Sequence, residues 1–367
     1  MLIWLLDQFG PLLERLEFYS TGDSRVFLTA RTALASLTAF LMAILLGPLA
    51  IRWLQNRFRE PIKSDSEKLN ELHSAKQDTP TMGGLFVVGA ILIAVLAWGD
   101  LTNRFVQLGL FSATAFALLG AYDDWTKLSS KKNGLKARQK LLAQILISSI
   151  TLPLLYLELR EIEGGTSLLS PVGNFAIPLG VGLIAWGVLV LVGSSNAVNL
   201  TDGLDGLASG CLIMCGATFV ALTYLAGHKV LAGYLSIPFI PGCGEFAVIM
   251  GALVGAVMGF LWFNCYPAQV FMGDTGSLSL GSLIGLAALT SRQEALLVIA
   301  GGVFVVETVS VILQVGWYKI SKKRLIACSP LHNHYLFKGQ HEIKIVTRFW
   351  ITAALLAILA LASLKIR

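Results

Sequence analysis

The chain has 367 residues, of which 55% are hydrophobic and 14% are charged, and its formal net charge is +6. This composition is too apolar for a soluble enzyme, and the chain is too long for one hydrophobic core. It predicts an all-α polytopic membrane protein. The basic residues lie beside the apolar segments, so the positive charge favours anionic headgroups and anionic substrates as partners, and not nucleic acid.

Ten apolar segments are candidates for transmembrane helices, because about 17 to 25 apolar residues are needed to cross a hydrocarbon core of roughly 30 Å. They are approximately residues 26–51, 82–98, 105–122, 141–157, 178–195, 207–226, 246–263, 278–290, 295–318 and 346–364. The eighth is short and rich in glycine. In the outer segment 158–177, the stretch from Ser167 to Ile177 is a candidate hairpin.

The distribution of lysine and arginine predicts the orientation. With the N-terminus outside, the cytoplasmic loops are residues 52–81, 123–140, 196–206, 264–277 and 319–345. With the flanking Arg348 they contain 19 of the 28 basic residues. Because short cytoplasmic loops are enriched in lysine and arginine, both termini are expected outside and the five loops are expected to form the active site.

The first of these loops ends in a turn with the sequence Thr79-Pro-Thr-Met-Gly-Gly84. Backbone N–H groups at the start of the following helix would attract phosphate, and Lys76 would add a positive charge. The alternative is an ordinary helix entry made by proline and glycine.

Two adjacent carboxylates, Asp123 and Asp124, stand where the third segment leaves the bilayer. Their repulsion is unfavourable unless a cation offsets it. Magnesium fits, because it accepts one or two carboxylates together with water and phosphate oxygens. One carboxylate could instead serve as a general base, or both could be solvated loop residues.

The third loop contains Asn199, Asp202 and Asp205, which recur every three residues. If this segment forms the start of a helix, the three side chains make a ladder of oxygen ligands and hydrogen-bond acceptors. A simple helix N-cap is the alternative, since Asp and Asn are favoured there.

The fourth loop carries Asp274 between Gly273 and Gly276, where the small neighbours leave the carboxylate free to reach a metal. Phe271 stands where a planar base could stack. It could also be an anchor at the membrane interface.

The ninth segment contains Glu307 and Gln314, seven residues apart and hence on one helix face. Ionisable groups at membrane depth usually face the bundle interior or a wet cavity. We interpret Glu307 as structural and favour ligand contact by Gln314.

The fifth loop contains His332, Asn333 and His334. These side chains suit phosphate or nucleotide binding. A transition metal is disfavoured because no thiol pair accompanies them, and solvated loop histidines are the alternative.

Together, the loops would bring carboxylates and basic residues to one surface: Asp123, Asp124, Asp202, Asp205 and Asp274. This inventory favours magnesium-assisted phosphoryl transfer. The absence of a P-loop motif disfavours ATP-driven transport. A site at the membrane surface makes a lipid phosphate a suitable acceptor.

Five motifs resemble those of the phospho-N-acetylmuramoyl-pentapeptide transferase family. They are PTMGG at 80–84, DD at 123–124, NAVNLTDGLDGL at 196–207, FMGDTGS at 271–277 and PLHNHY at 330–335. The match covers essentially all ten segments and five loops. The resemblance implies one transferase domain over residues 1–367, in the bacterial cytoplasmic (inner) membrane, as a homodimer with a broken, splayed ninth helix that makes a lipid groove.

The reaction implied by the resemblance is the first membrane step of peptidoglycan synthesis. Phospho-MurNAc-pentapeptide passes from UDP-MurNAc-pentapeptide to undecaprenyl phosphate, with Mg²⁺ as cofactor, giving lipid I and UMP. Either the lipid phosphate attacks directly or an aspartate first forms a phospho-enzyme. We favour direct attack, because a phosphate oxyanion needs little activation.

The resemblance also implies residue roles. Asp274 would bind magnesium, while Asp123 and Asp124 would handle the lipid phosphate, with Asp123 as the base. Substrate contacts are implied for Lys76, Thr81, Lys127, Lys140, Asn199, Asp202, Asp205, Asn264, Phe271, Gln314, His332 and His334. The family usually has a histidine where this chain has Asn333, and we interpret that position as one that orients phosphate.

Two other functions compete with this prediction. A sister enzyme would transfer an N-acetylhexosamine phosphate without a peptide, but the PTMGG and PLHNHY motifs argue against it. A transporter would use Glu307 and the aspartates to carry ions. No pair of interrupted helices in repeated halves supports that function.

Overall fold

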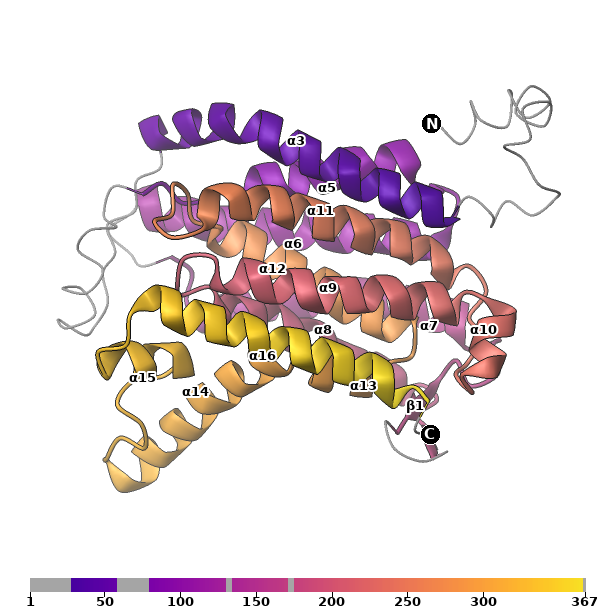
Figure 1. Ribbon diagram of the computed structural model, residues 1–367. Coiled ribbons are helices and arrows are strands. Elements are labelled where there is room, and N and C mark those ends of the chain that lie inside the picture. Colours follow the sequence, from indigo (N-terminus) through magenta and orange to yellow (C-terminus); the bar gives the residue numbers. More distant parts are fainter. Residues whose placement is uncertain (1–27, 58–78, 130–133, 171–174, 366–367) are drawn as a thin grey trace.

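The computed structural model describes residues 28–57, 79–129, 134–170 and 175–365, so Lys76 lies outside the described residues. Long helices run side by side and form one bundle (Figure 1). The elements in chain order are α3 (Leu28–Arg57), α5 (Gly84–Trp98), α6 (Arg104–Ser129), α7 (Ala137–Leu159), β1 (Ser167–Leu169), β2 (Ala176–Pro178), α8 (Gly182–Thr201), α9 (Leu207–Ala226), α10 (Lys229–Tyr234), η3 (Cys243–Glu245), α11 (Phe246–Asn264), α12 (Gly273–Thr290), α13 (Glu294–Ala300), α14 (Gly302–Ser321), α15 (Leu331–Phe337) and α16 (Glu342–Ser363).

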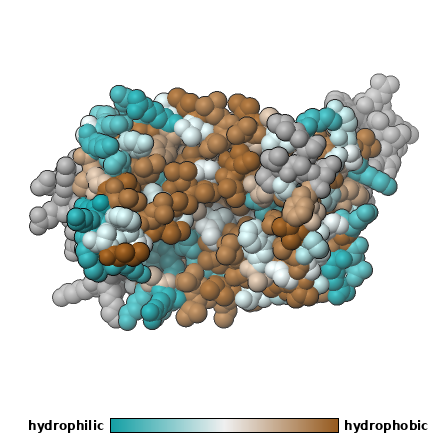
Figure 2. All heavy atoms as spheres, turned by 90° about the horizontal axis from the view of Figure 1, so that it is seen from below, coloured by the Kyte–Doolittle hydropathy of each residue, from teal (hydrophilic) through white to brown (hydrophobic). Residues whose placement is uncertain are grey.

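The helices fit a polytopic membrane protein. Among the described residues, eight helical segments are long and apolar enough to cross a bilayer. All ten predicted segments coincide with helical segments, but α5 has only 15 residues and α12 is not among the eight. Ten crossings and the orientation therefore remain predictions. A broad apolar region separates hydrophilic ends on the face shown in Figure 2.

Several helices run further than the apolar segments predicted. The sequence assigned 123–140 and 196–206 to loops, but α6 continues to Ser129, α7 begins at Ala137 and α8 continues to Thr201. The polar side chains of these terminal turns find partners inside the protein, so the chain need not leave the helix where its apolar run ends. Asp123, Asp124 and Asn199 therefore lie on helices.

Helix α12 is buried along its whole length and packs most extensively against α6 and α8. Serine side chains tie it to both neighbours: Ser279 Oγ donates to the Ala113 carbonyl (2.8 Å), and Ser195 Oγ donates to the Leu278 carbonyl (3.0 Å). Small residues allow such close helix packing within a membrane. The low hydropathy of α12 thus reflects burial in protein and not exposure to water.

The PTMGG segment pairs with the chain just before α12. Phe271 N donates to the Pro80 carbonyl, and the N–H groups of Gly83 and Gly84 donate to the Phe271 and Met272 carbonyls, each at 2.8 Å. The sequence had predicted that N–H groups at this helix start would attract phosphate, but those of Gly83 and Gly84 already donate to backbone carbonyls. They instead fix the start of α5 against the start of α12.

The ninth predicted span is broken at Gly301 into α13 and α14. From that point α14 diverges from the bundle and from α16 (Figure 1). This confirms the broken ninth helix that the resemblance implied. A largely apolar cavity of about 250 Å³ lies where α8 faces α13 and α14.

The predicted hairpin is also confirmed. Strands β1 and β2 pair antiparallel, with Leu168 opposite Ile177. The buried Arg292 donates to the Ser167 carbonyl (2.8 Å) and pairs with the buried Glu294 at 2.5 Å, which holds the hairpin against the start of α13.

We expect Gly84→Ala to destabilise the fold. A Cβ at Gly84 would lie 2.0 Å from the backbone nitrogen of Gly276, so α5 and α12 would have to separate. Overpacking of this kind costs about 1–3 kcal/mol. The measurement is the apparent melting temperature of the detergent-solubilised protein.

Gly89→Ala is the matched control in the same helix. A Cβ there meets no atom within 4 Å, and alanine favours helix, so its melting temperature should equal or exceed that of the wild type. Equal melting of all three proteins would contradict the close-packing interpretation.

Candidate active site

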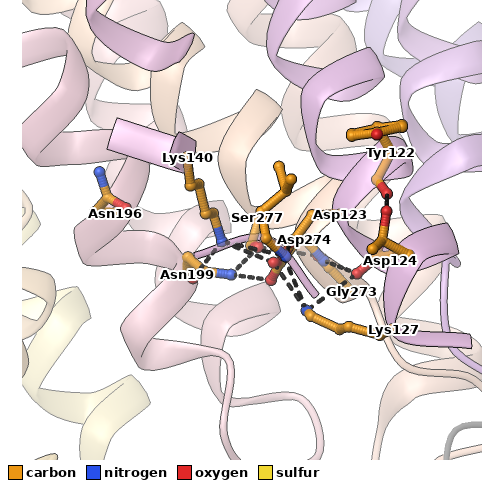
Figure 3. Close-up of polar contacts among 12 residues, drawn as sticks. Tyr122, Asp123, Asp124, Lys127, Lys140, Asn196, Asn199, Gly273, Asp274 and Ser277 are labelled. Atoms are coloured by element: carbon orange, nitrogen blue, oxygen red, sulfur yellow. Dashed lines mark hydrogen bonds and ion pairs between the residues drawn. The ribbon is translucent and has the colours of Figure 1, made fainter. Parts of the chain in front are cut away.

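Polar side chains from four helices converge at one end of the bundle, which we call the carboxylate end (Figure 3). They lie on the last turns of α6, the first turns of α7 and α12, and the last turn of α8. The residues are Asp123, Asp124, Lys127, Lys140, Asn199 and Asp274.

Asp274 is the centre of this cluster. Its Oδ2 accepts hydrogen bonds from Lys127 Nζ (2.9 Å) and Lys140 Nζ (2.7 Å), and its Oδ1 accepts one from Asn199 Nδ2 (2.6 Å). The Asn199 amide also donates to Ser277 Oγ (2.9 Å), one turn further along α12. A single carboxylate thus joins α6, α7 and α8 to α12.

Asp123 lies beside the same two lysines. Its Oδ2 is 3.2 Å from Lys127 Nζ and 3.7 Å from Lys140 Nζ, and its Oδ1 accepts the Leu135 N–H (2.6 Å). The residue is only 3% exposed. Since a buried charge is tolerated only when it is paired, the lysines and the two carboxylates must be considered as one unit.

Asp124 has a different role, because it caps α12. Its Oδ1 accepts the Asp274 N–H (3.1 Å), and its Oδ2 accepts the N–H (3.0 Å) and hydroxyl (2.7 Å) of Thr275. Gly273 has a φ of +71°, and a Cβ there would lie 2.7 Å from Asp124 Oδ2. The fully buried Asp124 therefore positions Asp274 through the helix N-terminus.

Asp202 is half-buried and follows the last residue of α8. Burial, and then the negative charges of Asp274, Asp124 and Asp205, raise the pKa of its carboxyl to about 7. Asp202 thus extends the negative field of the cluster toward the turn before α9.

The ion-pairing unit contains more carboxyl groups than ammonium groups. The carboxyl groups of Asp123, Asp124 and Asp274 face two ammonium groups, those of Lys127 and Lys140. Within the described part of the chain, no three His, Cys, Asp or Glu side chains converge closely enough to enclose a metal ion by themselves. The lysine ammonium groups can bind an anion, and the aspartate carboxyl groups can bind a cation supplied by the solvent or the substrate.

Comparisons with known proteins agree with these features. Residues 106–292, which include four of the helices just described, match the family model for glycosyl transferase family 4. A phospho-N-acetylmuramoyl-pentapeptide-transferase of Nitratidesulfovibrio vulgaris is 49% identical over 93% of this chain and 94% of its own length. Enzymes of the same name from Maridesulfovibrio salexigens and Desulfosudis oleivorans are 46% and 45% identical, over 93% and 97% of this chain and 94% and 98% of their own lengths. The chain belongs to the phospho-N-acetylmuramoyl-pentapeptide transferase family.

In this family member, two of the predicted substrate ligands hold loops together. Asp205 Oδ2 accepts the Ala268 N–H (3.0 Å). Asn264 Oδ1 accepts the Gly206 N–H (3.1 Å) and the Ser209 hydroxyl (2.9 Å). Both side chains are buried, and they join the turn before α9 to the segment between α11 and α12.

The ladder predicted from Asn199, Asp202 and Asp205 does not form. Helix α8 ends at Thr201, and Gly206, which precedes the first residue of α9, has a φ of +75°. The chain reverses between these points, so the three side chains face different surroundings. The spacing of three residues fits a helix, but in the structure no single helix contains all three residues.

Gln314 and His334 contact the chain that follows α14. Gln314 Oε1 accepts the N–H groups of Leu325 and Ile326, both at 3.0 Å, and His334 Nδ1 accepts the Ala327 N–H (3.1 Å). These bonds fold the segment after α14 back toward α15. Substrate contact by either residue stays a prediction.

Glu307 is the buried partner of His332. Glu307 Oε2 lies 3.2 Å from His332 Nδ1, and Oε1 accepts the His332 backbone N–H (3.1 Å). The other ring nitrogen faces the turn after Asp202, because a Cβ at Gly203 would lie 2.3 Å from His332 Nε2. Glu307 thus orients the histidine, a role that its position at membrane depth indicated but did not specify.

The last two predicted residues, Thr81 and Phe271, lie beside the start of α12. Thr81 is buried, and its hydroxyl would lie 3.0 Å from a Cβ placed on Gly273, so it borders the Asp124–Asp274 contact. Phe271 is half-buried, and its backbone pairs with the PTMGG segment.

The sequence analysis did not identify Ser277 as a partner of Asn199. Its position three residues after Asp274 on one helix face was the available signal.

We expect Asp124→Ala to lower stability more than Asp123→Ala. The first change leaves the start of α12 without its cap, which costs about 1–2 kcal/mol. The second removes a carboxylate that repels Asp274, and both lysines keep Asp274 as a partner. Apparent melting temperatures of the two variants measure the difference, and equal losses would contradict the capping role of Asp124.

The raised pKa of Asp202 predicts a pH dependence of stability. The folded protein holds this proton up to about pH 7, whereas an unfolded chain releases it near the ordinary aspartate pKa of 3.8. Stability from this group is therefore present at acid pH and is lost as the pH rises toward and through 7. Asp202→Asn should melt above the wild type at pH 8 and by a clearly smaller margin at pH 5, with EDTA present throughout. A difference that does not change with pH would contradict the raised pKa.

Proposed function

We propose that the protein transfers phospho-MurNAc-pentapeptide from UDP-MurNAc-pentapeptide to undecaprenyl phosphate, giving lipid I and UMP. The observation that carries the proposal is the convergence of Asp123, Asp274 and two lysines at one end of a bundle of membrane-length helices. The relatives that share nearly the whole length of the chain have the corresponding transferase name.

Charge balance supports magnesium as the cofactor. Its three carboxyl groups outnumber its two ammonium groups, so a cation from outside would balance the cluster once all three carboxyls are ionised and a diphosphate approaches. Magnesium accepts one or two carboxylates and completes its shell with water and phosphate oxygens, and Asp274 and Asp123 present such oxygens. When bound, it would neutralise charge on the diphosphate of the donor.

The side chains of this chain suggest how the transfer proceeds. Lys127 and Lys140 contact Asp274 in the free protein, so both ammonium groups would meet a diphosphate that binds at Asp274. Asp123 Oδ2 faces the same space and can accept a proton from the lipid phosphate. An oxygen of the lipid phosphate then forms a bond to the β-phosphorus of the donor, the bond to the bridging oxygen breaks, and UMP leaves.

The same proposal places the protein in the bacterial cytoplasmic membrane, with the carboxylate end facing the cytoplasm. UDP-linked donors are soluble, so this end must be the one that meets them. The apolar cavity between α8 and the diverging α14 supports access for a polyprenyl chain from within the bilayer. We infer a homodimer from the family resemblance alone.

The experiment is an assay of UMP release by the purified protein in detergent. The assay supplies undecaprenyl phosphate with either UDP-MurNAc-pentapeptide or UDP-GlcNAc. We expect release with the muramoyl-pentapeptide nucleotide only, its loss in EDTA and its recovery with Mg²⁺. Asp274→Asn should lower the rate by about 10²-fold or more, because it removes the shared partner of both lysines and Asn199.

Glu161→Gln is the control for the change from carboxyl to amide, because Glu161 is exposed and lies beyond α7, far along the chain from the cluster. Its activity should equal that of the wild type. Release with UDP-GlcNAc alone would assign the protein to the sister reaction, and release without Mg²⁺ would contradict the role of the metal.

A further inference from the structure

An exposed basic surface lies at the start of α16, beside α15 and at the same end of the bundle as the carboxylates (Figure 1). His341, Lys344 and Arg348 are exposed and are spaced three and four residues apart, so they share one side of the helix start. The ring of Tyr266, which is 44% exposed, packs edge-on against the His341 ring with centroids 5.8 Å apart. We call these four residues the α16 basic patch.

The positive charge of the α16 basic patch is directed outward. Glu342 is the acidic residue within this stretch, but its side chain is buried and its Oε1 accepts the Asp205 N–H (2.8 Å). Arg348 Nη1 donates to Gln340 Oε1 (3.3 Å), which leaves its charge uncompensated. Across residues 28–57, 79–129, 134–170 and 175–365, no carboxylate forms an ion pair with Lys344.

The α16 basic patch is attached to the turn that extends from the carboxylate cluster. Asp205 in that turn bonds to Glu342 at the start of α16 and to Ala268, two residues after Tyr266. Asp202, three residues earlier, is close enough to Asp274 for the charge of one to shift the pKa of the other. Hydrogen bonds thus join the patch to the same turn that carries Asp202.

The proposed donor has a part that the carboxylate cluster does not bind. In a muramoyl-pentapeptide, the muramoyl group acylates the N-terminus of the peptide, so the far end carries a free carboxylate. Five extended residues span at most about 17 Å, so this carboxylate must stay within roughly that distance of the sugar. An exposed cation beside a half-exposed aromatic ring suits a peptide end of this kind.

We propose that the α16 basic patch binds the peptide of the donor, with Lys344 paired to its C-terminal carboxylate and the Tyr266 and His341 rings against its backbone. This inference rests on the proposed function. A basic surface near a membrane could instead bind anionic headgroups. The attachment of the patch to the Asp202–Asp205 turn favours the peptide.

The test measures KM and kcat for UMP release with two donors, UDP-MurNAc-pentapeptide and its C-terminal carboxamide. The enzymes are the full-length wild type, Lys344→Glu and Lys323→Glu, in a neutral detergent. Lys323 is an exposed lysine beyond the end of α14 and controls for the charge change. An exposed ion pair contributes up to about fivefold in binding, and charge reversal adds repulsion.

We expect Lys344→Glu to raise KM for the free-acid donor about tenfold and KM for the carboxamide less than twofold, with kcat unchanged for both. Lys323→Glu should change neither constant. Equal effects of Lys344→Glu on the two donors, or an effect that appears only when anionic lipid is added, would overturn the peptide site while leaving the transferase intact. If the wild type releases UMP from neither donor, the proposed function fails and this inference with it.

Discussion

The burial of the Asp274 carboxylate is the constraint on which the site depends. A charge at the buried start of α12 must be paired, and its partners come from three other helices. Each partner is also close to the end of its own helix, so pairing Asp274 sets how far α6, α7 and α8 extend relative to α12. The same contacts that compensate the charge thus bring together the groups suited to phosphate chemistry.

A second set of residues keeps this arrangement in place through contacts with backbone groups and between helices. Asp124 caps α12, Asp205 and Asn264 join the turn before α9 to the segment before α12, and Gly84 lets α5 contact α12. Asp124, Asp205 and Gly84 belong to the family motifs as fully as Asp274 does, whereas Asn264 lies outside them. Backbone groups that would otherwise be unsatisfied, and space that a side chain would fill, explain why these residue types stand at these positions.

The break at Gly301 divides the ninth span into a packed helix and a diverging helix. Helix α13 stays in the bundle, while α14 diverges and leaves apolar cavities of about 250 and 260 Å³ beside α8 and α16. The buried pair of Glu307 and His332 then connects α14 to α15 and to the turn after Asp202. The segment that opens toward the bilayer is therefore coupled to the end that carries the carboxylates.

The sequence by itself determined the class of the protein and the positions of its helices, because apolar segments long enough to cross a bilayer have no other stable arrangement. It also identified the aspartates and lysines that converge, because they stand where the predicted segments leave the bilayer and in or beside motifs that resemble those of the family. Only the tertiary structure decided their roles. The spacing of Asn199, Asp202 and Asp205 could not reveal that α8 ends at Thr201, and adjacency could not reveal that Asp124 caps α12 while Asp123 faces the lysines. Motif spacing is a property of one segment, whereas each of these roles depends on which backbone and side-chain groups the other helices bring into contact.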